Sequence, residues 1–234
     1  MQRDLLDALR CPALHEESWL VAMVQRADGP ILIEAELACP LCGAEYRVQQ
    51  GEAWFRAESG SIQHQSVSAA PARADIERLA AQLGVMGGLA PVLLSGRYAS
   101  MAADYATLTG APVVIITAAA DETFTEHPAV SVLRIDRGLP LGASTLAAAA
   151  FDVAPEVGPS DASASASASA SALLAQVARA VRVGGRMLAP QSIVPMPAVS
   201  SMLRELARDD DEWVAELTSA TSGLVSLRRS PPPV

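Results

Sequence analysis

Two cysteine-proline turns near the start of the chain restrict its fold more than any other feature. The second turn, residues 39–43, holds two cysteines three positions apart and a glycine directly after them. Two thiolates at this spacing on a tight turn, followed by a residue that tolerates positive φ, are typical of a zinc knuckle. The first turn offers Cys11 and, four positions later, His15. We therefore predict a zinc-pinned module with Cys11, His15, Cys39 and Cys42 as its ligands.

Alternatives to this metal site stay open at the level of sequence. His64 is the next candidate for the fourth ligand, and three reduced cysteines in a small core, or an emptied site, are other interpretations. The chain has three cysteines, so two in a knuckle leave no even set for disulfides. This cysteine usage fits a reducing cytoplasm better than secretion.

Alternating helix and strand patterns follow the front module. Residues 58–74 are rich in Ser, Ala and Gln and indicate a linker between a first unit, residues 1–57, and a second, residues 75–230. Amphipathic helices from Asp75 and from about Tyr98 precede apolar runs, which we expect to be strands at residues 92–94, 113–116 and 130–135. β-branched runs without polar alternation suit parallel strands covered on both faces.

The second half of the chain continues the same alternation. We expect a stretch of ambiguous type at residues 146–153, a helix around residues 173–181, a strand at 186–189, a helix at 197–208 and a final hairpin of residues 213–218 with 224–228. The Ser-Ala tract at 161–172 predicts a flexible insert, and the acidic run at 209–212 a solvated turn. The fold class is therefore α/β, a Rossmann-like, mostly parallel sheet with a C-terminal antiparallel hairpin, preceded by a small β-rich zinc ribbon.

The first 55 residues resemble the Trm112-type zinc ribbon. That family opens with a short helix and Cys-Pro, continues with a two-stranded arm and Cys-Pro-x-Cys-Gly, and closes with a strand. The matching parts here are residues 4–9, 11–12, 19–24 with 31–37, 39–43 and 46–48. The first knuckle lacks its second cysteine. Members of the family serve as partners or fused modules of methyltransferases, and the resemblance implies such a role.

The chain from Asp75 onward resembles class I S-adenosylmethionine-dependent methyltransferases. The similar passages are Ile135-Asp136 with Leu139-Pro140-Leu141, then Phe151-Asp152-Val153, the helix and strand over residues 173–188, and the C-terminal hairpin. The resemblance implies a Rossmann-like sheet that binds S-adenosylmethionine, with Gly96, Asp121, Asp136 and Asp152 as the candidate cofactor residues.

The cofactor turn departs from that family's pattern. A family member cradles the methionine end of the cofactor with a Gly-x-Gly-x-Gly turn, and here only Gly96 remains, followed by Arg97 and Tyr98. The acid expected after the second strand falls near Thr117, and Asp121 comes several residues late. These losses indicate a decayed pocket. Arg97 is an alternative anion site or the partner of a salt bridge.

Charge restricts the partners further. The formal charge of the chain is -9, so binding to a phosphate backbone is disfavoured, although Arg134, Arg137, Arg228 and Arg229 are a possible local cluster. The longest alanine-rich apolar run is too short to span a membrane. We expect a cytoplasmic protein with a protein partner or a second copy of itself.

Three functions are compatible with these features. The favoured hypothesis is a methyltransferase-like protein with a decayed cofactor turn that acts as a non-catalytic partner- or ligand-binding module. The alternative is an active S-adenosylmethionine-dependent methyltransferase with an atypical pocket, in which the ribbon presents the substrate. A structural fragment with both sites empty is the third. No residue announces itself as a catalytic base.

Overall fold

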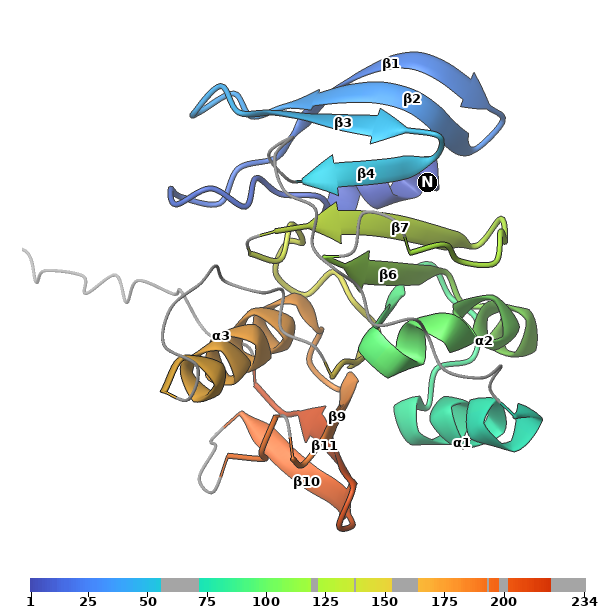
Figure 1. The fold of residues 1–234 in the computed structure, drawn as a ribbon, viewed down its shortest axis with the longest axis vertical. Helices are drawn as coiled ribbons and strands as arrows, with labels where there is room; N and C mark the ends of the chain where they lie inside the picture. The colour runs from blue at the N-terminus through green and yellow to red at the C-terminus, as the bar shows by residue number, and fades with distance from the viewer. Residues whose placement is uncertain are drawn as a thin grey trace, which may run out of the picture.

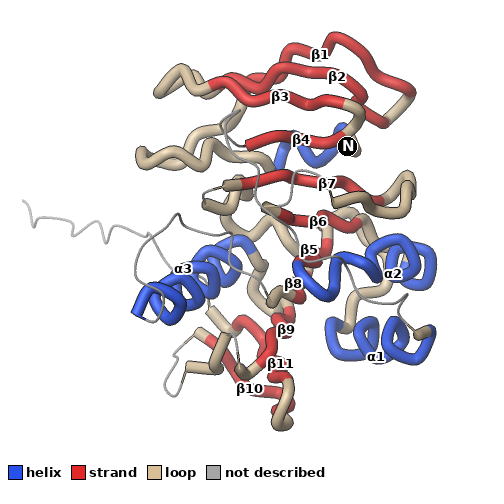
Figure 2. The backbone as a smooth tube through the Cα atoms, viewed as in Figure 1, coloured by secondary structure: helices blue, strands red, loops and turns tan. Residues whose placement is uncertain are grey.

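One mixed sheet runs through the described part of the chain. The computed structural model describes residues 1–55, 72–118, 122–136, 138–152, 164–192, 194–197 and 202–219. Within these ranges eleven strands lie in the order β1-β2-β3-β4-β7-β6-β5-β8-β9-β11-β10 (Figures 1 and 2). An antiparallel N-terminal part, a parallel centre and an antiparallel C-terminal end form this sheet, which is the predicted α/β class.

The N-terminal part matches the predicted short helix and strands. It contains η1 (Arg3–Ala8), β1 (Val21–Asp28), β2 (Ile31–Ala38), β3 (Glu45–Gln49) and β4 (Glu52–Phe55). All four strands pair antiparallel with their sequence neighbours. The last of them, β4, was not predicted.

The remaining elements alternate between helix and strand before a closing hairpin. They are α1 (Arg73–Leu83), β5 (Val92–Ser95), η2 (Gly96–Met101), α2 (Ala102–Thr109), β6 (Val113–Thr117), β7 (Val130–Ile135), β8 (Ala148–Ala150), α3 (Ala164–Ala180), β9 (Arg186–Pro190), β10 (Leu203–Arg208) and β11 (Glu212–Leu217). Taken from β5, the parallel strands have the spatial order third, second, first, fourth, fifth, which is the Rossmann order.

Helices cover both faces of the parallel strands, with α3 on one face and α1 and α2 on the other (Figure 2). Successive side chains of a strand point to opposite faces. Leu93 of β5 accordingly joins the core under α3, whereas Val92 and Leu94 join the core under α1 and α2. The core on the α3 side extends without a break into the N-terminal strands through Leu37 and Phe55. No helix in the described ranges combines the length and apolar character needed to cross a membrane.

The predicted helix at residues 197–208 was wrong. Residues 203–208 form β10, which pairs antiparallel with β11, and an ion pair of 2.8 Å joins Arg204 to Glu216 across the two strands. Short apolar spacing fits a helix and a strand alike, and the neighbouring strand decides between them. The hairpin therefore lies earlier in the chain than expected. Its second strand, β11 (Glu212–Leu217), corresponds to the predicted first arm at residues 213–218, and the predicted second arm, residues 224–228, lies outside the described residues.

The Ser-Ala tract also differs from the expected flexible insert of residues 161–172. Helix α3 begins at Ala164 and includes the rest of the tract, while residues 161–163 lie outside the described ranges. Alanine has the highest helix propensity, and the amphipathic stretch after it extends the same helix.

Strand β4 joins the N-terminal strands to the parallel sheet. It pairs parallel with β7, and Trp54 lies beside Arg134 in the register. The Arg134 side chain is only 4% exposed and contacts Glu52 through two hydrogen bonds of 2.6 and 3.0 Å. Its guanidinium also lies 5.1 Å from the centroid of the Trp54 ring. Backbone pairing and a largely buried ion pair therefore secure the same junction.

We predict that breaking this ion pair destabilises the protein asymmetrically. Glu52→Gln leaves the buried Arg134 charge without its carboxylate and is expected to lower the free energy of unfolding by about 3 kcal/mol. Arg134→Met is expected to cost less, because Glu52 is 27% exposed and can rehydrate. Urea denaturation measures both losses. Arg204→Met, which removes an exposed pair, is the control and should change stability by at most about 0.5 kcal/mol. Equal losses of unfolding free energy in all three variants would show that the Arg134–Glu52 pair stabilises the protein no more than an exposed ion pair does.

Candidate functional site

The four predicted metal ligands come together in the structure. The ligand atoms of Cys11, His15, Cys39 and Cys42 all lie within 4.8 Å of one another. Cys11 and His15 lie in the loop between η1 and β1, and Cys39 and Cys42 lie on the turn between β2 and β3. Gly43 adopts a φ of +70° and its N–H donates to the Cys39 carbonyl, which closes the turn. Positive φ at this position is what the knuckle requires.

The spacing of the donor atoms fits a tetrahedral metal ion. With Zn–S near 2.3 Å and Zn–N near 2.0 Å, two sulfurs of a tetrahedron lie about 3.8 Å apart, and a sulfur and a nitrogen about 3.5 Å. The Sγ atoms of Cys11 and Cys42 are 3.8 Å apart, and the Sγ atom of Cys39 is 3.5 Å from Nε2 of His15. The donor set and its dimensions therefore suit zinc.

Surrounding groups orient these donors. Nδ1 of His15 lies 2.5 Å from the Glu16 carbonyl, a contact that orients the ring with Nε2 toward Cys39. Burial opposes ionisation of Cys39, but backbone N–H groups of Cys42 and Leu41 stabilise the thiolate and lower its pKa to about 6. The Tyr46 hydroxyl lies 3.4 Å from Sγ of Cys11 and acts as a hydrogen-bond partner outside the cluster.

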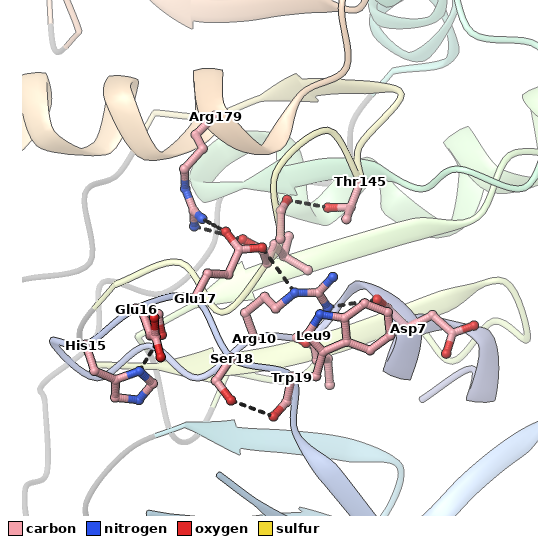
Figure 3. Close-up of polar contacts among 12 residues, drawn as sticks. Asp7, Leu9, Arg10, His15, Glu16, Glu17, Ser18, Trp19, Thr145 and Arg179 are labelled. Atoms are coloured by element: carbon pink, nitrogen blue, oxygen red, sulfur yellow. Dashed lines mark hydrogen bonds and ion pairs between the residues drawn. The ribbon is translucent and has the colours of Figure 1, made fainter. Parts of the chain in front are cut away.

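Ion pairs and hydrogen bonds attach the loop that carries Cys11 and His15 to the α/β part of the chain. Figure 3 shows Glu17 between Arg10 and Arg179 of α3. Glu17 contacts Arg10 at 3.1 Å and Arg179 at 2.5 Å. Two further hydrogen bonds reinforce this contact: the backbone N–H of Arg10 donates to the Pro140 carbonyl, and the Arg179 guanidinium donates to the Leu141 carbonyl. The metal loop is thus connected directly to α3 and to the segment after β7.

A second candidate site lies where the strand order reverses, between β5 and β8. Rossmann-like sheets bind ligands outside the carboxyl ends of their strands at this position. Gly96 directly follows β5 with a φ of +57°, and Asp152 follows β8. Asp136 follows β7 two strands away, so it lies at the same edge of the sheet. Asp121, the remaining cofactor candidate, lies outside the described residues.

Side chains of the protein itself fill this crevice. The backbone N–H of Arg97 donates to Oδ2 of Asp152 at 3.0 Å, and the Arg97 guanidinium contacts Oε1 of Glu212 at 2.8 Å. The Tyr98 hydroxyl donates to the same Glu212 oxygen at 2.8 Å, and Arg78 reaches the other oxygen at 2.9 Å. Arg97 is therefore the partner of two carboxylates, which agrees with the salt-bridge interpretation and leaves the anion site without support.

Burial sets the electrostatics of the crevice. The Asp152 and Glu212 side chains are only 8% and 5% exposed, respectively. Desolvation raises the pKa of Asp152, although the Arg97 backbone N–H and guanidinium oppose this shift. Oδ1 of Asp152 has no hydrogen-bond partner among the described residues.

A larger cavity of about 260 Å³ lies beside Ser100, Ile115 and Glu122, whereas the cavity on the α3 face is too small for a cofactor. This smaller cavity lies between the sheet and α3, beside Ser95, Ile135 and Phe151, and has a volume of about 10 Å³. A space of this size holds about one water molecule. At the end of β6, the Thr117 hydroxyl donates to Glu122 at 2.8 Å. Glu122 thus lies near the position where the acid that binds the cofactor ribose was expected.

Sequence reasoning missed several of these residues. Glu212 belongs to the acidic run that was expected to be solvated, but it is buried at the first position of β11. The sequence signal that could have identified Glu212 is the strand pattern that begins at this residue. Arg134, named as part of a possible local arginine cluster, is a buried residue, and the other three members of that cluster lie outside the described residues. Glu17 and Glu52 carry no local motif.

Comparison with known proteins gives fold neighbours only. No family model matches the chain, and no curated protein matches its sequence. Solved methyltransferase structures are similar to part of it, and the chain spans less than half of the length of one of them, geranyl diphosphate C-methyltransferase from Streptomyces coelicolor A3(2). That match has 17% identity, covers 50% of this chain and 44% of that protein, and has a TM-score of 0.36.

Two further structures cover more of this chain. An S-adenosyl-L-methionine methyl transferase from Silicibacter pomeroyi DSS-3 has 15% identity over 62% of this chain and 90% of that one, with a TM-score of 0.39. The antibiotic-resistance methyltransferase Kmr has 16% identity over 66% and 98%, with the same TM-score of 0.39. Similarity at this level transfers no activity.

Proposed function

We propose that the cysteine-histidine cluster binds one zinc ion that stabilises the N-terminal strands. Its four donors come from the protein, which leaves no open coordination position for a substrate or a reacting water. A closed site of this kind is structural, and zinc supplies folding energy there. The thiolate-favouring turn at Cys39 and the oriented ring of His15 support this assignment.

The zinc proposal predicts a specific loss in His15→Ala. Protein purified without chelator should contain one zinc per chain by mass spectrometry, and competition with a chromophoric chelator should show an affinity at least roughly 100-fold weaker in the variant. His64→Ala is the matched control and should retain the original affinity. Loss of zinc in His64→Ala alone would identify His64, and not His15, as the fourth ligand. An original protein that contains no zinc would contradict the proposal.

We propose further that the chain is a methyltransferase-like protein that acts as a non-catalytic partner- or ligand-binding module. The observation that carries this proposal is the network of Arg97, Tyr98, Asp152 and Glu212 at the switch point. These side chains occupy the place where a Rossmann-like sheet receives its ligand. A cofactor would have to displace a charged side chain from two buried carboxylates, which costs more than the few hydrogen bonds it would gain there.

An active methyltransferase with an atypical pocket is the alternative. Asp136 at the end of β7 favours it, because this residue lies at the carboxyl edge of the sheet where the cofactor of a related enzyme would be held. The alternative requires the cofactor to bind beside, and not within, the Arg97 network.

Calorimetric titration distinguishes the two functions. We expect no heat of binding from S-adenosylmethionine or S-adenosylhomocysteine at concentrations up to about 1 mM, which corresponds to a binding free energy weaker than about -4 kcal/mol. Micromolar binding that disappears in Asp136→Ala would contradict the non-catalytic proposal and support the enzyme. The zinc-loaded protein is used throughout, so that a folding defect is not mistaken for a lack of affinity.

A further inference from the structure

The crevice between β5 and β8 is built asymmetrically. Its two acids are fixed and buried, whereas its two cations reach in from partly exposed side chains: Arg78 is 52% and Arg97 47% exposed, against 5% for Glu212 and 8% for Asp152. The carboxylates are therefore buried at the sheet edge, and the guanidinium groups reach them from the solvent side.

Contacts other than the Arg97 guanidinium also hold both acids. Asp152 accepts the backbone N–H of Arg97, a bond that any residue at that position would retain. Glu212 begins β11 opposite Pro190, and its own N–H donates to Oδ1 of Asp209 at 2.7 Å. Without the Arg97 side chain, the Asp152 carboxylate keeps this backbone bond, and the Glu212 carboxylate keeps the Tyr98 hydroxyl and Arg78.

The binding capacity of this site is not exhausted by its present partners. Asp152 is buried, and its Oδ1 has no hydrogen-bond partner among the described residues. The Arg97 Nε atom is 3.8 Å from Oδ2, beyond hydrogen-bond distance. A planar cation with several N–H donors, placed where the Arg97 guanidinium lies, would contact Glu212 and lie close to Asp152. The Tyr98 ring, 5.1 Å from the Arg97 guanidinium carbon, adds a cation–π surface.

We propose that this crevice is a binding site for guanidinium-type cations and that the Arg97 side chain is its intramolecular occupant. The inference rests on the proposed function in one respect, namely that the crevice is filled by the protein. It adds the class of ligand: a free guanidinium compound, or an arginine side chain of a partner, takes the place of Arg97 on Asp152 and Glu212. An anionic ligand is excluded, because it would face both carboxylates as well as nearby Asp209.

Chemical rescue tests the proposal. Arg97→Ala removes the occupant and is expected to lower the melting temperature. Guanidinium chloride at about 20 mM, far below denaturing concentration, should then raise it by roughly 2–4 °C, and sodium chloride of equal ionic strength should not. The original protein should show no increase. In Arg97→Ala with Glu212→Gln the rescue should disappear, because one of the two carboxylates has lost its charge.

A matched control separates site binding from a general salt effect. Arg204→Ala also removes the arginine of an ion pair, but its partner Glu216 is 25% exposed on the outer hairpin. Guanidinium should not raise the melting temperature of this variant. Equal rescue of Arg97→Ala and Arg204→Ala, or rescue by sodium chloride, would overturn the proposal.

A second measurement applies if Arg97→Ala fails to fold. Arg97→Lys keeps the charge but loses the forked donors, so agmatine should bind it at least roughly tenfold more tightly than it binds the original protein. Equal agmatine affinity would overturn the proposal. The outcomes remain distinct from those of the cofactor titration: failed rescue without cofactor binding refutes only the cation site, whereas cofactor binding refutes the non-catalytic function.

Discussion

Parallel pairing of β4 with β7 is the contact on which the arrangement of this protein depends. It continues the antiparallel N-terminal strands into the parallel sheet, so that a single core under α3 is shared by both. An edge strand of a Rossmann-like sheet would otherwise expose unpaired backbone groups. Arg134 and Glu52 add a charged contact that is specific to this register, since a shift of β4 by one residue would move Glu52 to the opposite face of the sheet from Arg134.

Direct contacts connect the cysteine-histidine cluster to the part of the chain around this shared sheet. Glu17, only two residues after His15, contacts Arg179 of α3, and the backbone of Arg10 bonds the segment after β7. Loss of the metal would therefore loosen contacts on the α/β part as well as on the N-terminal strands. Under the zinc proposal, the metal would therefore stabilise the α/β part as well as the N-terminal strands.

A feature of this structure could be predicted from the sequence where its signal lies in neighbouring residues. The Cys39 turn and the apolar runs at β5, β6 and β7 depend on neighbouring residues, and the structure contains them as expected. The strand β10 was misread as a helix because its pairing with β11 is decided by tertiary contacts. The partners in the crevice, Arg97 and Glu212, are 115 positions apart, and no local pattern connects them. Pairing of β4 with β7 is equally non-local.

The central claim is that the protein's own side chains occupy the crevice at the switch point. A crystal structure of the zinc-loaded protein grown with millimolar S-adenosylhomocysteine tests it most directly. The account predicts that Arg97 still contacts Glu212, as it does at 2.8 Å here, and that no cofactor lies between β5 and β8. Cofactor bound beside Gly96, with Arg97 turned away from both carboxylates, would contradict it.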